Sequence, residues 1–323
     1  MDRYALQAAV RIANAFAALS LSVVLLGACS IMQPTADLPV TAPPSVRAVA
    51  PSNGLALVLS GGSARAFAHV GVIAVLEEAG VRPTIVVASS AGSIVGALYA
   101  AGLDPDALRQ AAREANWNMV NDWQIQWKML GVVRGEHIEA FVNRHVQQRK
   151  FAALPKRLAV IATDMQTGAL TPFNEGDIGR AVRASCAVPA MFVPVEIAGR
   201  LYVDGSLSSP LPVSTALAMG ATMVIAVDVG YPPEHAKVGN PIDVLLQTGL
   251  IQTHRLRALE ARNADVVIAP DLPPTNGQYS FADRDMLIAA GERAARVALP
   301  RIRALLAQRQ RQVDLRQTQS DTP

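Results

Sequence analysis

Short apolar runs alternate with longer stretches of helical periodicity along most of this 323-residue chain. Five runs are short enough for buried strands and end at turn-forming or polar residues: 55–59, 84–88, 158–163, 201–203 and 223–227. Helical patterns begin near Ala66 and recur over 94–101, 104–115, 135–148 and 283–312, the first of them amphipathic. Strands that alternate with helices predict an α/β domain of three layers with a mostly parallel central sheet.

The N-terminal residues follow a different pattern. Residues 1–28 carry two arginines before an apolar run, 16–26, that is too short for a membrane-spanning helix and ends in Leu-Gly-Ala before Cys29. This resembles a bacterial lipobox, which implies a lipid-modified Cys29 that anchors the mature protein to a membrane. A periplasmic or extracellular position is expected. Ser30 directly follows Cys29, so the acidic signal that retains lipoproteins at the inner membrane is lacking at this position, and sorting to an outer membrane is expected. The alternative is an ordinary secretion signal with a chance cysteine.

Composition divides the rest of the chain. Residues 29–53 contain five prolines and are expected to form an extended tether; residues 54–312 form the folded domain, and residues 313–323 a polar, disordered tail. A hydrophobic content of 51% suits one large core, whereas a net charge of +3 without a basic stripe excludes a nucleic-acid partner. Cys186, the only cysteine besides Cys29, is expected to be a buried structural thiol.

The candidate chemistry lies where two of the predicted strands meet their helices. The segment 88–92, Ala-Ser-Ser-Ala-Gly, resembles a nucleophile elbow with Ser90 at the bend and Gly92 two residues later. The turn after the first strand contains Gly61, Gly62 and Ser63, whose backbone N–H groups can stabilise the oxyanion of an acyl-transfer reaction. The two turns are expected to lie side by side.

These motifs resemble the patatin-like phospholipase family, in a lipoprotein form, between about residues 55 and 229. The resemblance rests on the glycine turn with Arg65, on Ser90, and on Asp204-Gly205-Ser206, in the family's order. It implies a Ser90–Asp204 dyad, an oxyanion hole at Gly61, Gly62 and Ser63, supporting roles for Arg65, Gly92 and Gly205, and no metal or cofactor. The chain departs from the family pattern at four positions: Ser63, Ala66, Ala88 and Ser206.

Three predicted strands end at an aspartate, and all three aspartates are candidate bases if the strands are parallel: Asp164, Asp204 and Asp228. Asp204 is favoured because Gly205 permits a tight turn, while Asp164 is expected to brace a hairpin. His235 has the chain order of an α/β-hydrolase triad but lies in a Pro/Gly-rich loop, and His69 is expected to have a core or capping role.

Residues 116–133 contain all three tryptophans, Trp117, Trp123 and Trp127. Such a cluster can line an acyl-chain pocket or contact a membrane interface. Packing inside a helical lid is favoured over direct contact with lipid, because tryptophans are usually buried.

The expected activity is hydrolysis of an acyl ester of a membrane phospholipid or lysophospholipid. One alternative is a catalytically weakened lipid-binding or scaffolding lipoprotein of the same fold. A nucleotide site is a second alternative, because phosphates also bind at glycine turns before helices. However, neither common nucleotide-binding glycine motif is present.

Overall fold

The computed structural model describes residues 54–123, 130–235, 238–272 and 281–320. Its strands form one eight-stranded sheet in the order β5-β6-β3-β2-β1-β7-β8, with β4 paired to β3. The strands are β1 (Leu55–Leu59), β2 (Ile85–Ser89), β3 (Arg157–Asp164), β4 (Leu170–Phe173), β5 (Val195–Ile197), β6 (Arg200–Asp204), β7 (Met223–Val227) and β8 (Val266–Ile268). From β3 to β8 along this order neighbouring strands are parallel, which confirms the predicted mostly parallel sheet.

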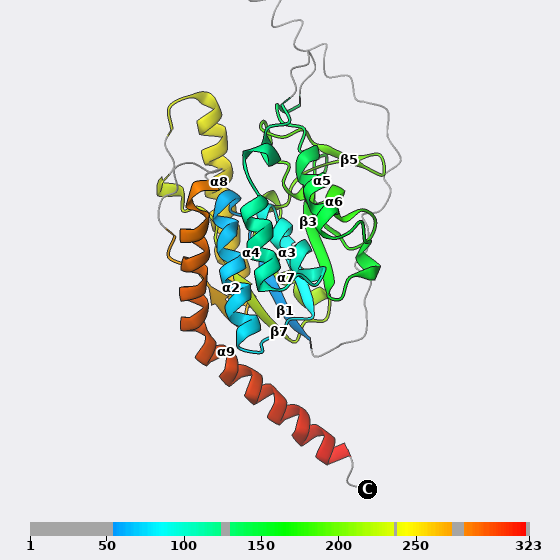
Figure 1. The fold of residues 1–323 in the computed structure, drawn as a ribbon, viewed down its shortest axis with the longest axis vertical. Helices are drawn as coiled ribbons and strands as arrows, with labels where there is room; N and C mark the ends of the chain where they lie inside the picture. The colour runs from blue at the N-terminus through cyan, green and yellow to red at the C-terminus, as the bar shows by residue number, and fades with distance from the viewer. Residues whose placement is uncertain (1–53, 124–129, 236–237, 273–280, 321–323) are drawn as a thin grey trace, which may run out of the picture. The chain divides into compact units, whose positions relative to one another are not determined.

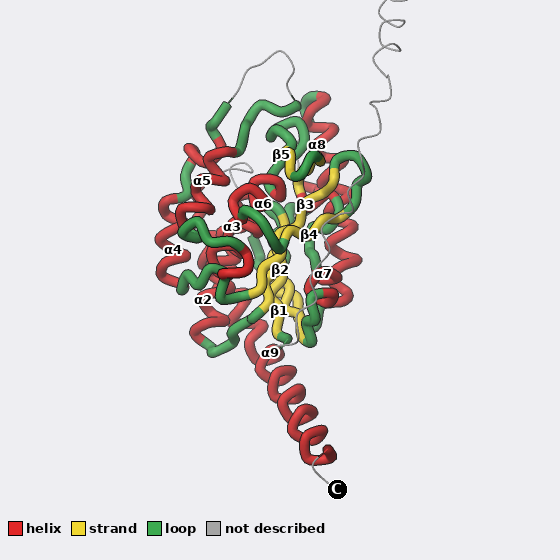
Figure 2. Tube along the Cα trace, turned by 90° about the vertical axis from the view of Figure 1, so that its right-hand side faces the viewer, coloured by secondary structure: helices red, strands yellow, loops and turns green. Residues whose placement is uncertain are grey.

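Helices cover both faces of the sheet, so the predicted three layers are confirmed (Figure 2). Side chains of β1 alternate between two cores: Leu57 and Leu59 face the larger one, and Ala56 and Val58 the smaller one, beside α7. The longer helices are α2 (Phe67–Glu78), α3 (Ala91–Ala100), α4 (Pro105–Glu114), α5 (Glu136–His145), α6 (Ile178–Ser185), α7 (Val213–Ala218), α8 (Pro241–Glu260) and α9 (Arg284–Ser320).

Helix α2 was expected to be amphipathic, but most of its residues are buried. The reason is α9, which lies along α2 in Figure 1 and contributes Leu287 and Ile288 to the same core. The two backbones approach closely at two glycines: a Cβ at Gly71 would lie 2.0 Å from the Ile288 carbonyl oxygen, and one at Gly291 2.0 Å from the Ala68 carbonyl oxygen. A helix covered by the sheet on one side and by another helix on the other needs no polar face.

Helix α9 also continues to Ser320, beyond the expected end near Gln312, so residues 313–320 of the predicted disordered tail are helical. The helix continues past the last residues with apolar periodicity because Gln and Arg are good helix formers even where they have no core to pack against. The predicted signal segment, the Cys29 anchor and the tether lie outside the described residues. Within the part of the chain that is described, no helix is long and apolar enough to cross a bilayer.

Candidate active site

Ser90 occupies the bend between β2 and α3. Its backbone has φ 50° and ψ −136°, a conformation that non-glycine residues rarely adopt and that costs about 1–3 kcal/mol. Two contacts hold it: the Ser90 N–H donates to Ser185 Oγ at 2.8 Å, and Ser93 Oγ donates to the Ser90 carbonyl oxygen at 2.6 Å. A Cβ at Gly92 would lie 2.4 Å from the Ser60 carbonyl oxygen, so only glycine lets the elbow lie this close to the end of β1. The bend therefore projects the Ser90 hydroxyl from a fixed backbone.

Asp204 is the hydrogen-bond partner of that hydroxyl. Ser90 Oγ donates to Asp204 Oδ2 at 2.6 Å, and the Ser206 N–H donates to Asp204 Oδ1 at 2.8 Å. Burial raises the pKa of Asp204 to about 6, and hydrogen bonds from Ser90 and Ser206 limit the rise. A carboxylate with this pKa is mostly ionised at neutral pH and can accept a proton from the serine.

The strand that carries Asp204 does not run as the sequence suggested. β6 is antiparallel to β3, so a shared strand direction does not explain why Asp204 lies beside Ser90. It reaches Ser90 through register: Asp204 pairs with Ala162 of β3, and the neighbouring Ile161 pairs with Ser89 of β2. Gly205 permits the turn there, since a Cβ would lie 2.1 Å from the Ile161 carbonyl oxygen.

The glycine turn after β1 lies against Ser90. A Cβ at Gly61 would be 2.9 Å from the Ser90 Cβ and 2.4 Å from Ser206 Oγ. The Gly61 N–H donates to the Pro210 carbonyl oxygen at 3.3 Å, so one of the three predicted donors is engaged. Among the described residues, the N–H groups of Gly62 and Ser63 donate no hydrogen bond. Ser63 has φ 48°, the left-handed region in which glycine is easiest to accommodate.

Arg65 is buried behind this turn. Its guanidinium stacks over the Tyr231 ring at 4.9 Å from the centroid, and within the described part of the chain its Nε has no hydrogen-bond partner. Burial lowers the pKa of Arg65 from its ordinary value. The side chain therefore supports the turn by packing on Tyr231.

The other two candidate aspartates are engaged elsewhere. Asp164 Oδ1 accepts from the backbone and hydroxyl of Thr167, which confirms that it braces the β3–β4 hairpin, and Arg200 donates to its Oδ2 at 2.6 Å. Asp228 pairs with Arg257 at 2.7 Å. Neither interaction involves Ser90.

The histidines do not contribute to this hydrogen bond. His69 is fully buried and its Nε2 donates to the Ser60 carbonyl oxygen at 2.9 Å. Burial lowers the pKa of His69 to about 4, so the ring is neutral and structural. His235 lies in a short 3₁₀ helix, Pro233–His235, between β7 and α8. Ser90 donates its hydroxyl proton to a carboxylate and not to an imidazole.

Two cavities meet at Ser90. The larger cavity, about 290 Å³, is lined by residues that include Asp204, Ser206, Tyr231, Leu246, Leu250 and Arg257. The apolar cavity, about 100 Å³, is lined by residues that include Ile94, Met119, Val120, Ile138, Phe192 and Phe281. Ser63, Ser90 and Val188 border both. A group bonded to Ser90 can therefore extend into an apolar space on one side and a partly polar space on the other.

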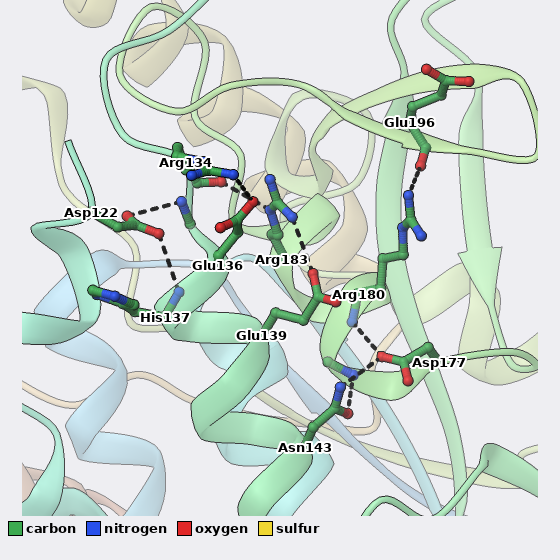
Figure 3. Close-up of polar contacts among 12 residues, drawn as sticks. Asp122, Arg134, Glu136, His137, Glu139, Asn143, Asp177, Arg180, Arg183 and Glu196 are labelled. Atoms are coloured by element: carbon green, nitrogen blue, oxygen red, sulfur yellow. Dashed lines mark hydrogen bonds and ion pairs between the residues drawn. The ribbon is translucent and has the colours of Figure 1, made fainter. Parts of the chain in front are cut away.

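The tryptophan-bearing segment covers the apolar cavity, with an unexpected orientation. Met119 and Val120 are buried and line the cavity, whereas Trp117 and Trp123 are 51% and 57% exposed. The expected burial of these two indoles is wrong; Trp127 lies outside the described residues. Asp122 ties the segment to α5 by accepting from the backbone N–H groups of Gly135 and His137 (Figure 3).

Helices α5 and α6 form the base to which this segment is attached. Figure 3 shows an ion pair between Arg183 and Glu139 and a hydrogen bond from Asn143 to Asp177, the N-cap residue of α6. Because these contacts join the segment, α5 and α6, the wall of the apolar cavity is built from elements that hold one another in place.

Comparison with known proteins shows which family shares this arrangement of residues. Residues 57–217 match the model of a family described as patatin-like phospholipase. The chain belongs to the patatin-like phospholipase family. The match runs from within β1 to within α7 and so includes the glycine turn, Ser90 and Asp204, while α8 and α9 lie outside it.

Relatives of this patatin-like chain occur in bacteria and mammals. An uncharacterized NTE family protein of Mycobacterium tuberculosis is 33% identical over 175 residues, 54% of this chain and 49% of its own length. A second such protein of that species is 31% identical over 273 residues, 76% of this chain and 46% of its own length. Human patatin-like phospholipase domain-containing protein 6 is 34% identical over 188 residues, 56% of this chain and 14% of its own length. This chain spans less than half the length of each of these relatives.

Two residues of the patatin-like site were not expected to contribute. Ser185 accepts the Ser90 N–H and donates to the Ile161 carbonyl oxygen at 2.5 Å. Ser206 hydrogen-bonds the Asp204 carboxylate through its backbone and side chain. The Ser185 contact depends on segments that the sheet brings together, so no spacing in the sequence indicates it. Ser206 lies two residues after Asp204, so its contact is a local one within the turn.

Proposed function

We propose that this protein is a serine acyl-ester hydrolase of phospholipids or lysophospholipids, held on a membrane through a lipidated Cys29. The observation that carries the proposal is the 2.6 Å hydrogen bond from Ser90 Oγ to Asp204 Oδ2, beside the unbonded N–H groups of Gly62 and Ser63. Membership of the patatin-like phospholipase family supports the same substrate class.

In the first half-reaction Ser90 Oγ attacks the ester carbonyl carbon while Asp204 takes the hydroxyl proton. The carbonyl oxygen becomes an oxyanion, and the N–H groups of Gly62 and Ser63 donate to it. When the intermediate collapses, the ester C–O bond breaks, the leaving alcohol takes the proton from Asp204, and an acyl-Ser90 ester remains.

In the second half-reaction Asp204 takes a proton from water, whose oxygen attacks the acyl-Ser90 carbonyl. Collapse of this intermediate returns the proton to Ser90 Oγ and releases the fatty acid. The carbonyl end of the acyl chain occupies the apolar cavity, and the alcohol with its head group leaves through the larger cavity, where Tyr231 and Arg257 lie.

Covalent labelling and turnover test this proposal together. The purified chain is treated with a fluorophosphonate and assayed against a panel of phospholipids, lysophospholipids and soluble esters. Labelling and hydrolysis are expected in the natural chain and in Ser89→Ala, which removes the neighbouring buried hydroxyl, and neither in Ser90→Ala. A folded natural chain that takes no label and turns over no ester contradicts the hydrolase and favours the alternative, a lipid-binding or scaffolding lipoprotein of the same fold.

A further inference from the structure

The second half of the chain contains a helix with apolar residues on two opposite faces. The inner face of α8 contributes Leu246, Leu250, Thr253 and Arg257 to the larger cavity. The outer face, one side of the helix at intervals of three and four residues, carries Val244, Ile251 and Leu259, which are 54%, 40% and 53% exposed. A helix that is apolar on both sides is normally covered on both sides.

Among the described residues, polar contacts between α8 and the rest of the domain come from its inner side, from its two ends and from Gln247 at the border of the outer face. Arg257 pairs with Asp228, and Glu260 accepts from the Leu211 N–H at 2.8 Å and from the Ser209 hydroxyl. Gln247 Nε2 donates to the Pro233 carbonyl oxygen at 2.9 Å. These contacts fix which side of α8 faces the cavity, so the outer face is directed away from the domain.

The outer face is continuous with the mouth of the larger cavity. Leu245 and Leu207 line that cavity and are also 58% and 37% exposed, so apolar surface runs from the cavity over the edge of α8. Arg255 is the charged residue of the outer face, and no carboxylate lies on it. An apolar strip with a single arginine suits the boundary between acyl chains and phosphate head groups, where the guanidinium can reach the phosphates.

We propose that the outer face of α8 docks on the surface of a lipid bilayer and so brings the mouth of the larger cavity to the membrane. The inference rests on the proposed lipid substrate, which is poorly soluble as a monomer. Docking lets a lipid move from the bilayer along Leu245 and Leu207 to Ser90 without crossing water.

A reporter attached to the outer face tests the contact directly. In the full chain with Cys29→Ser and Ser90→Ala, Ile251→Cys provides one exposed thiol, because Cys186 is buried. An environment-sensitive dye at residue 251 is expected to gain intensity and shift to the blue when phosphatidylcholine–phosphatidylglycerol vesicles are added. The same dye at Val297→Cys, an exposed position on α9, is expected to change little.

Dye at residue 251 that responds no more than dye at residue 297 overturns the proposal. A response to protein concentration without vesicles also overturns it, because the outer face then binds a second copy of the chain. These measurements use a Ser90→Ala background, so their outcome is separate from fluorophosphonate labelling of the natural chain.

A kinetic comparison provides a second test. Val244→Ser, Ile251→Ser and Leu259→Ser together are expected to lower the ratio of vesicle hydrolysis to soluble-ester hydrolysis by about tenfold, because three side chains lose partial burial in lipid. The matched control replaces three exposed apolar residues elsewhere by serine, Leu217, Met286 and Val297, and is expected to keep the ratio. An equal ratio in both variants contradicts docking through α8.

Discussion

Asp204 is a carboxyl group in a buried position where the neutral form is favoured, and its proposed reaction needs the charged form. Burial raises its pKa to about 6, so the fraction of ionised base grows as pH rises through 6. We expect kcat/KM for a soluble ester to be half-maximal near pH 6 and to level off above about pH 7. Ser206→Ala removes a hydrogen bond that lowers this pKa and is expected to move the inflection upward; a profile flat from pH 5 to 8 contradicts Asp204 as the base.

The same burial predicts an effect on stability. The folded-state pKa of about 6 lies above the ordinary aspartate pKa of 3.8, so folding favours the protonated form, and stability falls as pH rises from about 3.8 through about 6. Asp204→Asn keeps the shape without the charge and is expected to raise the free energy of unfolding at pH 8 by roughly 3 kcal/mol. The gain should vanish near pH 4. Thermal unfolding at both pH values measures it, and loss of activity with a higher Tm excludes misfolding as the cause.

Ser185 is a positioning residue for the proposed nucleophile. Its Oγ accepts the N–H of Ser90, whose backbone has φ 50°, and a buried hydrogen bond of this kind contributes about as much as the strain costs. We expect Ser185→Ala to lower kcat and the rate of fluorophosphonate labelling while KM stays close to the natural value. An unchanged labelling rate in a folded variant would show that the elbow keeps its conformation without Ser185.

At the level of elements, α2 and α9 approach each other closely at Gly71 and Gly291. Gly291→Ala would place a Cβ 2.0 Å from the Ala68 carbonyl oxygen, so the two helices must separate. Overpacking of this kind typically costs about 1–3 kcal/mol, and we expect a lower Tm. Gly249→Ala in α8 is the matched control: a Cβ there meets nothing within 4 Å, so the better helix former should raise stability by about 0.5–1 kcal/mol. Chemical denaturation of both variants gives the comparison.

The elements show what the sequence can and cannot predict. Apolar runs bounded by turn residues predicted β1, β2, β3 and β7, because buried strands need little more than that pattern. The direction of β6 could not be predicted, since it depends on pairing with β3 and not on local composition. The burial of α2 depends on α9, which follows it by about 200 residues. Long-range contacts therefore account for the two differences between prediction and structure, the direction of β6 and the burial of α2.

The sequence predicted the main residues of the site but not the contacts that hold them in place. Local motifs singled out Ser90, Asp204 and the glycine turn, because tight turns and small residues leave a signature in the sequence. Two other contacts have no signature in the sequence: the hydrogen bond from the Gly61 N–H to Pro210 and the one from the Ser90 N–H to Ser185. Both partners come from distant segments of the chain. The exposed indoles of Trp117 and Trp123 had no local signal either.

For the whole molecule, the direction of β1 has a consequence for the proposed anchor. β1 begins at Leu55 and ends beside Ser90, so the chain enters the domain at the end of the sheet remote from the cavities. If Cys29 is held in the bilayer, the 24 residues 30–53 connect it to Gly54, and they can span at most about 85 Å. The length of this tether then limits whether the domain can rotate far enough for the mouth of the larger cavity to contact the leaflet that holds the anchor. Deleting half of the tether should abolish attack on that leaflet while dispersed esters are still cleaved.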